Sequence, residues 1–226
     1  MNISVIIPAL NEEVRIADAI LSVGRGVEVI VVDGGSSDST VEVAEQLGVK
    51  VVVSERGRGL QMDEGARVAG GDILLFLHAD TRLPKGWPVA VRRVLSMRGV
   101  VGGAFRLRID SPGLLFRVIE GGANLRSRCF GLIFGDQAIF ARRKAFLAID
   151  SLRTLPLMED VECVKRLKRS GKVRVVSASV VTSHRRWGDG GALSTTLKNW
   201  AILIRYLFGI SPEKLYLRYY KKTNNK

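Results

Sequence analysis

Cysteine and histidine are both scarce in this chain of 226 residues, which contains two of each. Cys129 and Cys163 are far apart and form no CxxC pair, which argues against a disulfide framework and against a cysteine-based zinc site. Two isolated cysteines also predict a reducing compartment. We expect both to be small buried packing residues rather than reactive thiols.

Long apolar runs are absent as well. No stretch approaches the roughly 20 apolar residues that a membrane-spanning helix needs. The strand pattern at residues 3–7 begins without a basic leader, so no signal peptide is predicted. We therefore expect a cytoplasmic protein, either soluble or associated with the inner face of the membrane.

Two common nucleotide-binding motifs are also missing. No GxGxxG follows a strand, and no GxxxxGK[ST] is present. Their absence disfavours a dinucleotide-dependent dehydrogenase and a P-loop NTPase. Any nucleotide site in this chain must be built from other residues.

The net charge of +13 is unevenly distributed. Residues 1–100 carry 11 basic and 13 acidic side chains, whereas residues 101–226 carry 24 basic and 9 acidic ones. We therefore expect no nucleic-acid partner for the first half. The second half is expected to face a phosphate-bearing substrate, a membrane surface or nucleic acid, with a merely solvated basic surface as the alternative.

Strand and helix patterns alternate through the first half. Strands are expected at residues 3–7, 27–32, 49–53 and 73–77, with helices between them at about 12–23, 39–47 and 60–69. Alternation at this spacing predicts βαβ units and an α/β fold with a mainly parallel sheet flanked by helices.

The second half has a different pattern. We expect strands at residues 100–109, 133–141, 173–176 and 179–182, and helices at about 112–129 and 159–169. The tail from about 192 to 220 is predicted to be mostly helical. One domain over residues 1–190 with a C-terminal helical extension over 191–226 fits this pattern best.

Each early strand ends in a polar turn, and these turns hold residues 8–13, 33–40, 54–59 and 78–80. In a parallel sheet such turns meet at one edge, where open α/β sheets bind ligands. Asp33 can accept a hydrogen bond from a base or a ribose, and Gly35 lets the backbone come close to a ligand. Arg56 and Arg58 can neutralise phosphates. Together the turns predict a site for a nucleoside diphosphate.

The fourth strand runs directly into His78, Ala79 and Asp80. A carboxylate and an imidazole two residues apart suit a divalent cation, Mn²⁺ or Mg²⁺, that holds a diphosphate. The alternative is that Asp80 or Thr81 caps a helix near Pro84.

These motifs resemble the family 2 glycosyltransferases of the GT-A fold. The resemblance is carried by Pro-x-x-Asn-Glu at residues 8–12, Val-Asp-x-Gly-Ser-x-Asp-x-Thr at 32–40, the strand that ends in Asp80, and Leu-Met-Glu-Asp at 157–160. It covers about residues 1–190 and is nearest to small bacterial and archaeal members with a His-Ala-Asp metal motif. It implies a Rossmann-like GT-A fold, with a nucleotide-sugar half over residues 1–100 and an acceptor half over 101–190.

The activity that the resemblance implies is transfer of a sugar from a nucleoside-diphosphate sugar to an acceptor, usually with inversion and with a divalent metal. Pro8, Asn11 and Glu12 match the first nucleotide-contacting loop. Asp33 matches the first acid of the base-binding turn, but Gly34 stands where relatives often have a second acid. The choice between uridine and guanosine therefore stays open.

Asp80 matches the last acid of the family's metal motif, and His78 replaces the first acid. Imidazole is a softer ligand than carboxylate, which favours Mn²⁺ over Mg²⁺ if His78 reaches the metal. His184 is a further candidate ligand, with a structural histidine as the alternative.

Asp160 matches the general base that takes the proton of the acceptor hydroxyl, and Glu159 precedes it. A well-placed carboxylate contributes roughly 10²–10⁴-fold to such a reaction. The alternative is that both acids only favour the N-terminus of the following helix.

Several other residues are candidates for the sugar and acceptor pocket. Asp136 and Gln137 resemble a segment that lines it, with a simple turn as the alternative. Gly103 leaves room for the donor sugar or marks a bulge in a strand. Arg185 or Arg186 can bind the diphosphate leaving group, and Trp187 can stack on a sugar ring.

The tail carries apolar residues at helical spacing, followed by basic and aromatic ones. This pattern is typical of a helix at a membrane interface, but a helix packed on its own domain or on a dimer partner has it too. We interpret the chain as a metal-dependent inverting glycosyltransferase with an unknown, anionic or lipid-linked acceptor. The alternative is a non-catalytic nucleotide- or membrane-binding module derived from this fold.

Overall fold

The computed structural model describes residues 1–187 and 191–221, without the side chains of Arg186, Tyr220 and Lys221. The first half alternates as predicted. Its elements are β1 (Ile3–Ala9), α1 (Ile16–Val23), β2 (Glu28–Asp33), α2 (Thr40–Gln46), β3 (Lys50–Val53), α3 (Arg58–Val68) and β4 (Ile73–Phe76).

The second half mixes strands with helices of very different length. The first elements are β5 (Thr81–Arg82), α4 (Trp87–Leu95), β6 (Val100–Asp110), α5 (Leu114–Cys129), the 3₁₀ turn η1 (Gly135–Gln137), β7 (Phe140–Arg142) and α6 (Arg143–Leu147). They are followed by α7 (Glu159–Ser170), β8 (Lys172–Ser183), the 3₁₀ turn η2 (His184–Trp187), α8 (Ala192–Leu207) and α9 (Pro212–Lys221).

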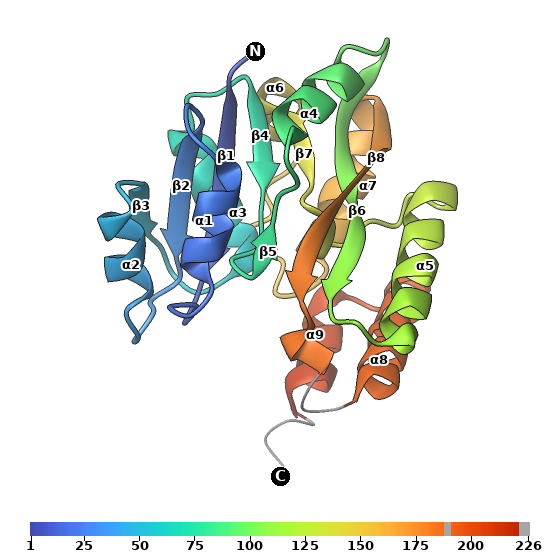
Figure 1. The fold of residues 1–226 in the computed structure, drawn as a ribbon. Coiled ribbons are helices and arrows are strands. Elements are labelled where there is room, and N and C mark those ends of the chain that lie inside the picture. The colour runs from blue at the N-terminus through green and yellow to red at the C-terminus, as the bar shows by residue number, and fades with distance from the viewer. Residues whose placement is uncertain (188–190, 222–226) are drawn as a thin grey trace.

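All eight described strands form one sheet in the order β3-β2-β1-β4-β7-β6-β8-β5. The strands β1 to β4 are parallel, β7 is antiparallel to both of its neighbours, and β8 runs parallel to β6. The carboxyl ends of β1, β2, β4, β6 and β8 therefore point the same way, toward the side on which α8 and α9 lie (Figure 1). The predicted mixed, mainly parallel sheet is confirmed.

Helices cover both faces of the sheet. In β1, Val5 and Ile7 face the cluster that contains α1, α2 and α4, whereas Ile6 faces the cluster that contains α3, α6 and α7. All three side chains are fully buried. This double burial explains why the early strands read as continuous apolar runs.

Two predicted strands differ from the observed ones. The segment 133–141 was expected to be extended, but only Phe140–Arg142 forms a strand because η1 and the left-handed backbone of Ala138 (φ 46°) interrupt it. The two short strands expected at 173–176 and 179–182 are one strand, β8, whose irregular pairing with β6 absorbs the break. The elements β5 and α6 were not predicted. The helix considered near Pro84 corresponds to α4, but its N-cap residue is Gly86, so neither Asp80 nor Thr81 caps it.

The C-terminal helices pack against the start of α7. Ile202, Leu203 and Leu215 form a buried cluster with Met158 and Val161. Of the three placements considered for the tail, packing on its own domain is therefore observed for its inner face. Within the part of the chain that is described, no helix is both long and apolar enough to cross a membrane.

The two cysteines differ in environment. Cys163 is buried in the core, as expected, but Cys129 is exposed, so that expectation was wrong. Cys129 ends α5, and several of the neighbouring side chains on the outer side of this helix are also exposed.

Gly103 packs inside the sheet rather than beside a ligand. A Cβ there would lie 2.3 Å from the carbonyl oxygen of Arg174 and 2.5 Å from the ring of Phe140. The structure therefore contradicts the prediction that Gly103 leaves room for a donor sugar, because Phe140 fills the space.

We predict that Gly103→Ala destabilises the fold by about 1–3 kcal/mol, because backbone and a buried ring must both move. Urea unfolding followed by circular dichroism measures this change. Gly121→Ala is the matched control, since a Cβ at this exposed helical position meets nothing within 4 Å, and we expect a small gain in stability. Equal effects of the two substitutions would contradict the packing described for Gly103.

Candidate active site

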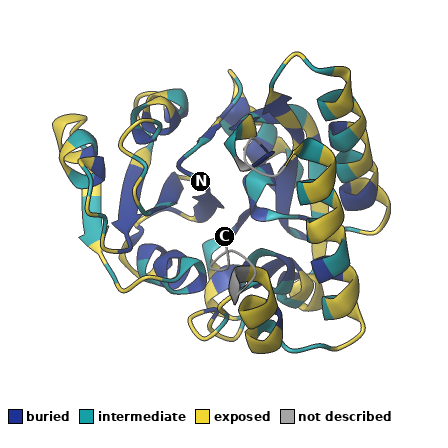
Figure 2. Cartoon of the chain, turned by 90° about the horizontal axis from the view of Figure 1, so that it is seen from below, coloured by how far each residue is buried: buried dark blue, intermediate teal, exposed yellow. Residues whose placement is uncertain are grey.

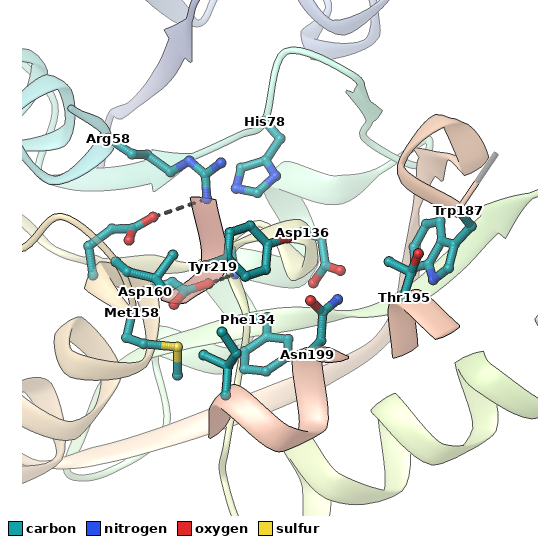
Figure 3. A pocket seen from close by; sticks show the side chains of 14 residues that line it. Arg58, His78, Phe134, Asp136, Met158, Asp160, Trp187, Thr195, Asn199 and Tyr219 are labelled. Atoms are coloured by element: carbon teal, nitrogen blue, oxygen red, sulfur yellow. Dashed lines mark hydrogen bonds and ion pairs between the residues drawn. The ribbon is translucent and has the colours of Figure 1, made fainter. Parts of the chain in front are cut away.

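A cavity of about 360 Å³ opens at the carboxyl edge of the sheet. Its lining comes from α3, the β4–β5 loop, η1, the start of α7, and the C-terminal helices. Figure 3 shows His78, Asp136 and Asp160 converging on this space from three separate segments. The cavity thus joins both halves of the chain.

Asp160 lies in the first turn of α7, with its half-buried carboxylate on the cavity wall. The backbone N–H of Gly135 donates to Oδ2 at 2.7 Å, and that of Val161 donates to Oδ1 at 2.7 Å. Burial raises the pKa of Asp160 to about 6, and the charge of Glu159 adds to the rise. The two N–H groups and Arg58 act in the opposite direction. The result is a carboxyl group that titrates close to neutral pH.

Glu159 is buried beside Asp160 and forms an ion pair across the cavity. Nη1 of Arg58 donates to its Oε1 at 3.0 Å (Figure 3). Arg58 begins α3 in the first half of the chain, whereas Glu159 begins α7. This pair therefore fixes the two halves relative to each other and compensates one of two adjacent carboxylates.

Gly135 lies close to both a candidate metal ligand, His78, and the candidate base, Asp160. A Cβ at this position would lie 2.5 Å from Nε2 of His78 and 3.5 Å from Oδ2 of Asp160. The absence of a side chain thus lets the imidazole and the carboxylate approach the same point. This arrangement connects the His-Ala-Asp loop to the Glu-Asp turn.

Left-handed backbone is concentrated around the candidate site. Apart from glycines, the described residues with positive φ are Asn11 (54°), Ala138 (46°) and Met158 (65°). Met158 directly precedes Glu159 and lines the cavity, and Asn11 lies in the first predicted nucleotide loop. Residues held in this region cost of order 1–3 kcal/mol each and cluster at functional sites.

The two predicted nucleotide turns bind each other. The backbone N–H of Asn11 donates to Oγ of Ser36, and Oδ1 of Asn11 accepts from the N–H of Ser37 at 2.9 Å. The buried Asp33 carboxylate accepts from the N–H groups of Gly35 and Ser36. Asp33 thus organises its own turn, and its predicted contact with a base or a ribose stays a prediction.

Other predicted nucleotide residues lie near these turns. Pro8 belongs to β1, opposite Val32 of β2, and Gly35 has a φ of 86° within the turn. Arg56 is exposed in the loop before α3. Their nucleotide contacts also stay predictions.

Glu12, Asp80 and Arg185 form a charged group. Nη2 of Arg185 donates to Oε1 of Glu12 and lies 3.9 Å from Oδ2 of Asp80. Oε2 of Glu12 is buried with no hydrogen-bond partner among the described residues. Sequence reasoning did not decide between Arg185 and Arg186, and the structure brings Arg185 to the acids. The side chain of Arg186 lies outside the described residues.

The surroundings of Asp80 fit a metal ion that is partly coordinated by substrate. Its side chain is only 5 % exposed, yet its contacts are long, at 3.4 Å to the Thr81 hydroxyl and 3.9 Å to Arg185. The described residues contain no cluster of three or more histidine, cysteine or acidic groups able to hold a metal. One or two protein ligands completed by phosphate oxygens are a usual arrangement for Mg²⁺ and similar cations.

His184 follows the strand residue Ser183, whose N–H donates to the carbonyl of Asp80 at 3.0 Å. Nδ1 of His184 lies 2.8 Å from the carbonyl oxygen of Asp110. A proton on Nδ1 would orient the ring and direct the lone pair of Nε2 outward, as in many metal-binding histidines. The side chains of His78, Asp80 and His184 are nevertheless not gathered into one cluster here, so the ligand role of His184 stays a prediction.

Gln137 and Trp187 differ from the open pocket residues that were predicted. Nε2 of the fully buried Gln137 donates to the carbonyl of Phe105 at 2.9 Å and to the hydroxyl of Ser127 at 3.1 Å, so this side chain supports the core instead of lining the pocket. Trp187 does line the cavity, but it is buried and its ring packs edge-to-face on Phe116.

Sequence reasoning missed part of the cavity wall. Thr195, Asn199 and Ile202 of α8 and Tyr219 of α9 line it (Figure 3). A buried cation was missed as well, since the guanidinium of Arg126 lies 3.6 Å from the ring centre of Phe134. Burial lowers the pKa of Arg126, and the charges of Asp136 and Asp160 oppose this shift. The helical spacing of α8 and α9 in the sequence did not indicate that side chains of these two helices face a cavity.

Comparison with known proteins identifies the family. The family model described as glycosyl transferase family 2 matches residues 4–148. The chain belongs to glycosyltransferase family 2. The match includes the nucleotide turns, the His-Ala-Asp loop and η1.

Two curated relatives match part of the chain. The 4,4'-diaponeurosporenoate glycosyltransferase of Staphylococcus haemolyticus is 39% identical over 93 residues, which are 36% of this chain and 25% of the relative. The glucosyl-3-phosphoglycerate synthase of Mycobacterium tuberculosis is 36% identical over 92 residues, 34% of this chain and 28% of the relative. The matched part thus spans only about a quarter of each relative's length.

A solved structure of glucosyl-3-phosphoglycerate synthase from M. tuberculosis, in complex with Mn²⁺ and uridine-diphosphate-glucose, has a similar fold. Its TM-score is 0.63 at 22% identity, over 90% of this chain and 78% of that one. The family match and this similarity confirm the expected GT-A fold.

We predict that Asp160→Asn stabilises the protein relative to wild type as the pH rises. The carboxyl group binds its proton more tightly in the folded chain, with a pKa of about 6, than in the unfolded chain, with a pKa of about 3.9. The protonated carboxyl group therefore contributes to the stability of wild type. This contribution is fully present below about pH 4 and is lost above about pH 6. The difference between the two proteins should grow over this window by on the order of 2 kcal/mol.

Urea unfolding at a series of pH values measures this difference. Asp150→Asn is the control, because Asp150 is exposed, and its difference from wild type should stay flat over the same window. A flat difference for Asp160→Asn would contradict the raised pKa.

Proposed function

We propose that this protein is a metal-dependent inverting glycosyltransferase that uses a nucleoside-diphosphate sugar as donor. The observation that carries the proposal is the Asp160 carboxylate on the cavity wall, held by two backbone N–H groups, with a pKa of about 6. A general base works best when its pKa lies near the operating pH. We further propose that residues 1–100 bind the donor and residues 101–190 the acceptor.

In this reaction Asp160 accepts the proton of the acceptor hydroxyl while the hydroxyl oxygen attacks the anomeric carbon of the sugar. The bond between that carbon and the diphosphate oxygen breaks, and the nucleoside diphosphate leaves. Attack from the face opposite the leaving group inverts the configuration. The positive charge of Arg58 compensates the carboxylate of Glu159. The negative charge of Glu159 therefore does not raise the pKa of Asp160 further.

Asp80 would hold the divalent metal, with His78 and His184 as further candidate ligands. When bound, the metal neutralises the diphosphate and stabilises it as a leaving group. Mn²⁺ is our proposal over Mg²⁺, because of the imidazole groups and because the similar mycobacterial structure contains Mn²⁺. That structure also contains a uridine nucleotide, so we propose a uridine-diphosphate sugar as the first donor to test.

The proposal predicts that donor binding and turnover can be separated. Asp160→Asn should retain calorimetric binding of the donor and lose about 10²–10⁴-fold in turnover, because only the proton acceptor is removed. Asp80→Ala should instead lose the Mn²⁺-dependent part of donor binding. The measurement is isothermal titration with UDP, GDP and dTDP sugars, with and without Mn²⁺, followed by transfer or donor-hydrolysis assays.

Asp150→Asn again serves as the carboxylate control and should match wild type in both assays. Donor binding without any Asp160-dependent turnover in wild type would favour a non-catalytic module derived from this fold. Failure of every nucleotide to bind would contradict the donor proposal.

A further inference from the structure

An apolar surface extends over the outer sides of α5 and α8. These two helices contact each other, and Arg126 of α5 lies 5.9 Å from the ring centre of Trp200 in α8. The exposed apolar side chains that define this α5–α8 surface are Val118, Leu125, Leu193, Leu197, Ile204 and Leu207. Viewed from below, many exposed residues are visible on the helices at the right-hand edge (Figure 2).

The arrangement on α8 is regular. Its exposed apolar residues are spaced by three or four positions, at 193, 197, 200, 204 and 207. This spacing places them along one side of the helix. The opposite side carries Thr195 and Asn199, which line the cavity. One side of α8 therefore faces the candidate active site while another faces solvent.

The charge of this region identifies the kind of partner that it fits. In residues 111–134 and 191–211 the only acidic residue is Glu120, and it is buried beside Arg117. Arg128, Lys198 and Arg205 are exposed on the same two helices. Apolar side chains flanked by basic ones, without an exposed carboxylate, are complementary to an anionic lipid surface.

We propose that the α5–α8 surface binds the surface of an anionic membrane, with its apolar side chains at the level of the headgroups. Aromatic residues suit this depth. Trp200 lies in the exposed apolar row of α8, and Phe208, which follows the last residue of the helix, is also exposed. The cavity lies directly behind α8, so a lipid-linked acceptor could reach Asp160 from the membrane. This last step depends on the proposed function, whereas membrane binding itself does not.

The experiment is co-sedimentation of the full chain with vesicles of phosphatidylcholine, with and without phosphatidylglycerol. Wild type should bind the anionic vesicles and release them as salt is added, because exposed charges are screened. The double variant Leu197→Glu/Ile204→Glu should lower the partition coefficient at least tenfold. Lys198→Gln/Arg205→Gln should weaken binding to the anionic vesicles and leave the weak binding to neutral ones unchanged.

The matched control is Leu21→Glu/Val89→Glu. Leu21 and Val89 are 65% and 69% exposed on α1 and α4, compared with 60% and 45% for Leu197 and Ile204. The control variant adds the same charge away from the α5–α8 surface and should bind vesicles as wild type does. Circular dichroism of each variant confirms that it folds.

Three results would overturn the membrane proposal. The first is failure of wild type to bind either vesicle, and the second is equal binding of the two double glutamate variants. The third is a dimer in sedimentation velocity that only Leu197→Glu/Ile204→Glu dissociates, which would make a second copy of the chain the partner. Turnover of a soluble donor, measured without vesicles, tests the proposed function separately, so each proposal can fail alone.

Discussion

The candidate site depends on two carboxylates that are placed side by side at the start of α7. Glu159 and Asp160 would repel each other if both were ionised and left without partners, and burial strengthens that repulsion. Arg58 compensates Glu159 from the other half of the chain, whereas the hydrogen bonds that Asp160 accepts among the described residues come from backbone N–H groups, and its carboxylate lines the cavity. Burial, together with the charge of Glu159, raises the pKa of Asp160 to about 6.

The same contacts explain how the rest of the site is assembled. The N–H of Gly135 fixes η1 against Asp160, and the missing side chain of Gly135 admits His78 from the β4–β5 loop. The α8 helix completes the wall and carries an apolar outer side. The β4–β5 loop, the proposed base Asp160 and the helix α8, which carries part of the proposed membrane surface, thus meet around one cavity at the carboxyl edge of the sheet.

Much of the first half was predictable, because each early strand is buried on both faces and ends in a polar turn at the same edge. Asp80 and the alternating elements follow from that pattern, whereas Asp160 was predicted from the resemblance to family 2 glycosyltransferases. The second half was less predictable, since Gly103, Gln137 and Ala138 are set by tertiary contacts. Gly103 makes room for a ring, and Gln137 donates to the carbonyl of Phe105 and to the hydroxyl of Ser127. Neither contact leaves a local signal in the sequence. The cavity-facing side of α8 was hidden for the same reason, because apolar spacing does not reveal what a helix packs against.

We propose Asp160 as the base of a sugar-transfer reaction. The most direct test is the pH dependence of kcat/KM, which reports the groups that titrate in the uncomplexed enzyme. A protonated carboxyl group cannot accept the acceptor proton, so the account predicts that kcat/KM falls tenfold per pH unit below about pH 6, and that the residual activity of Asp160→Asn lacks this limb. A wild-type profile that stays flat down to about pH 4, the ordinary range of a carboxyl group, would contradict the account.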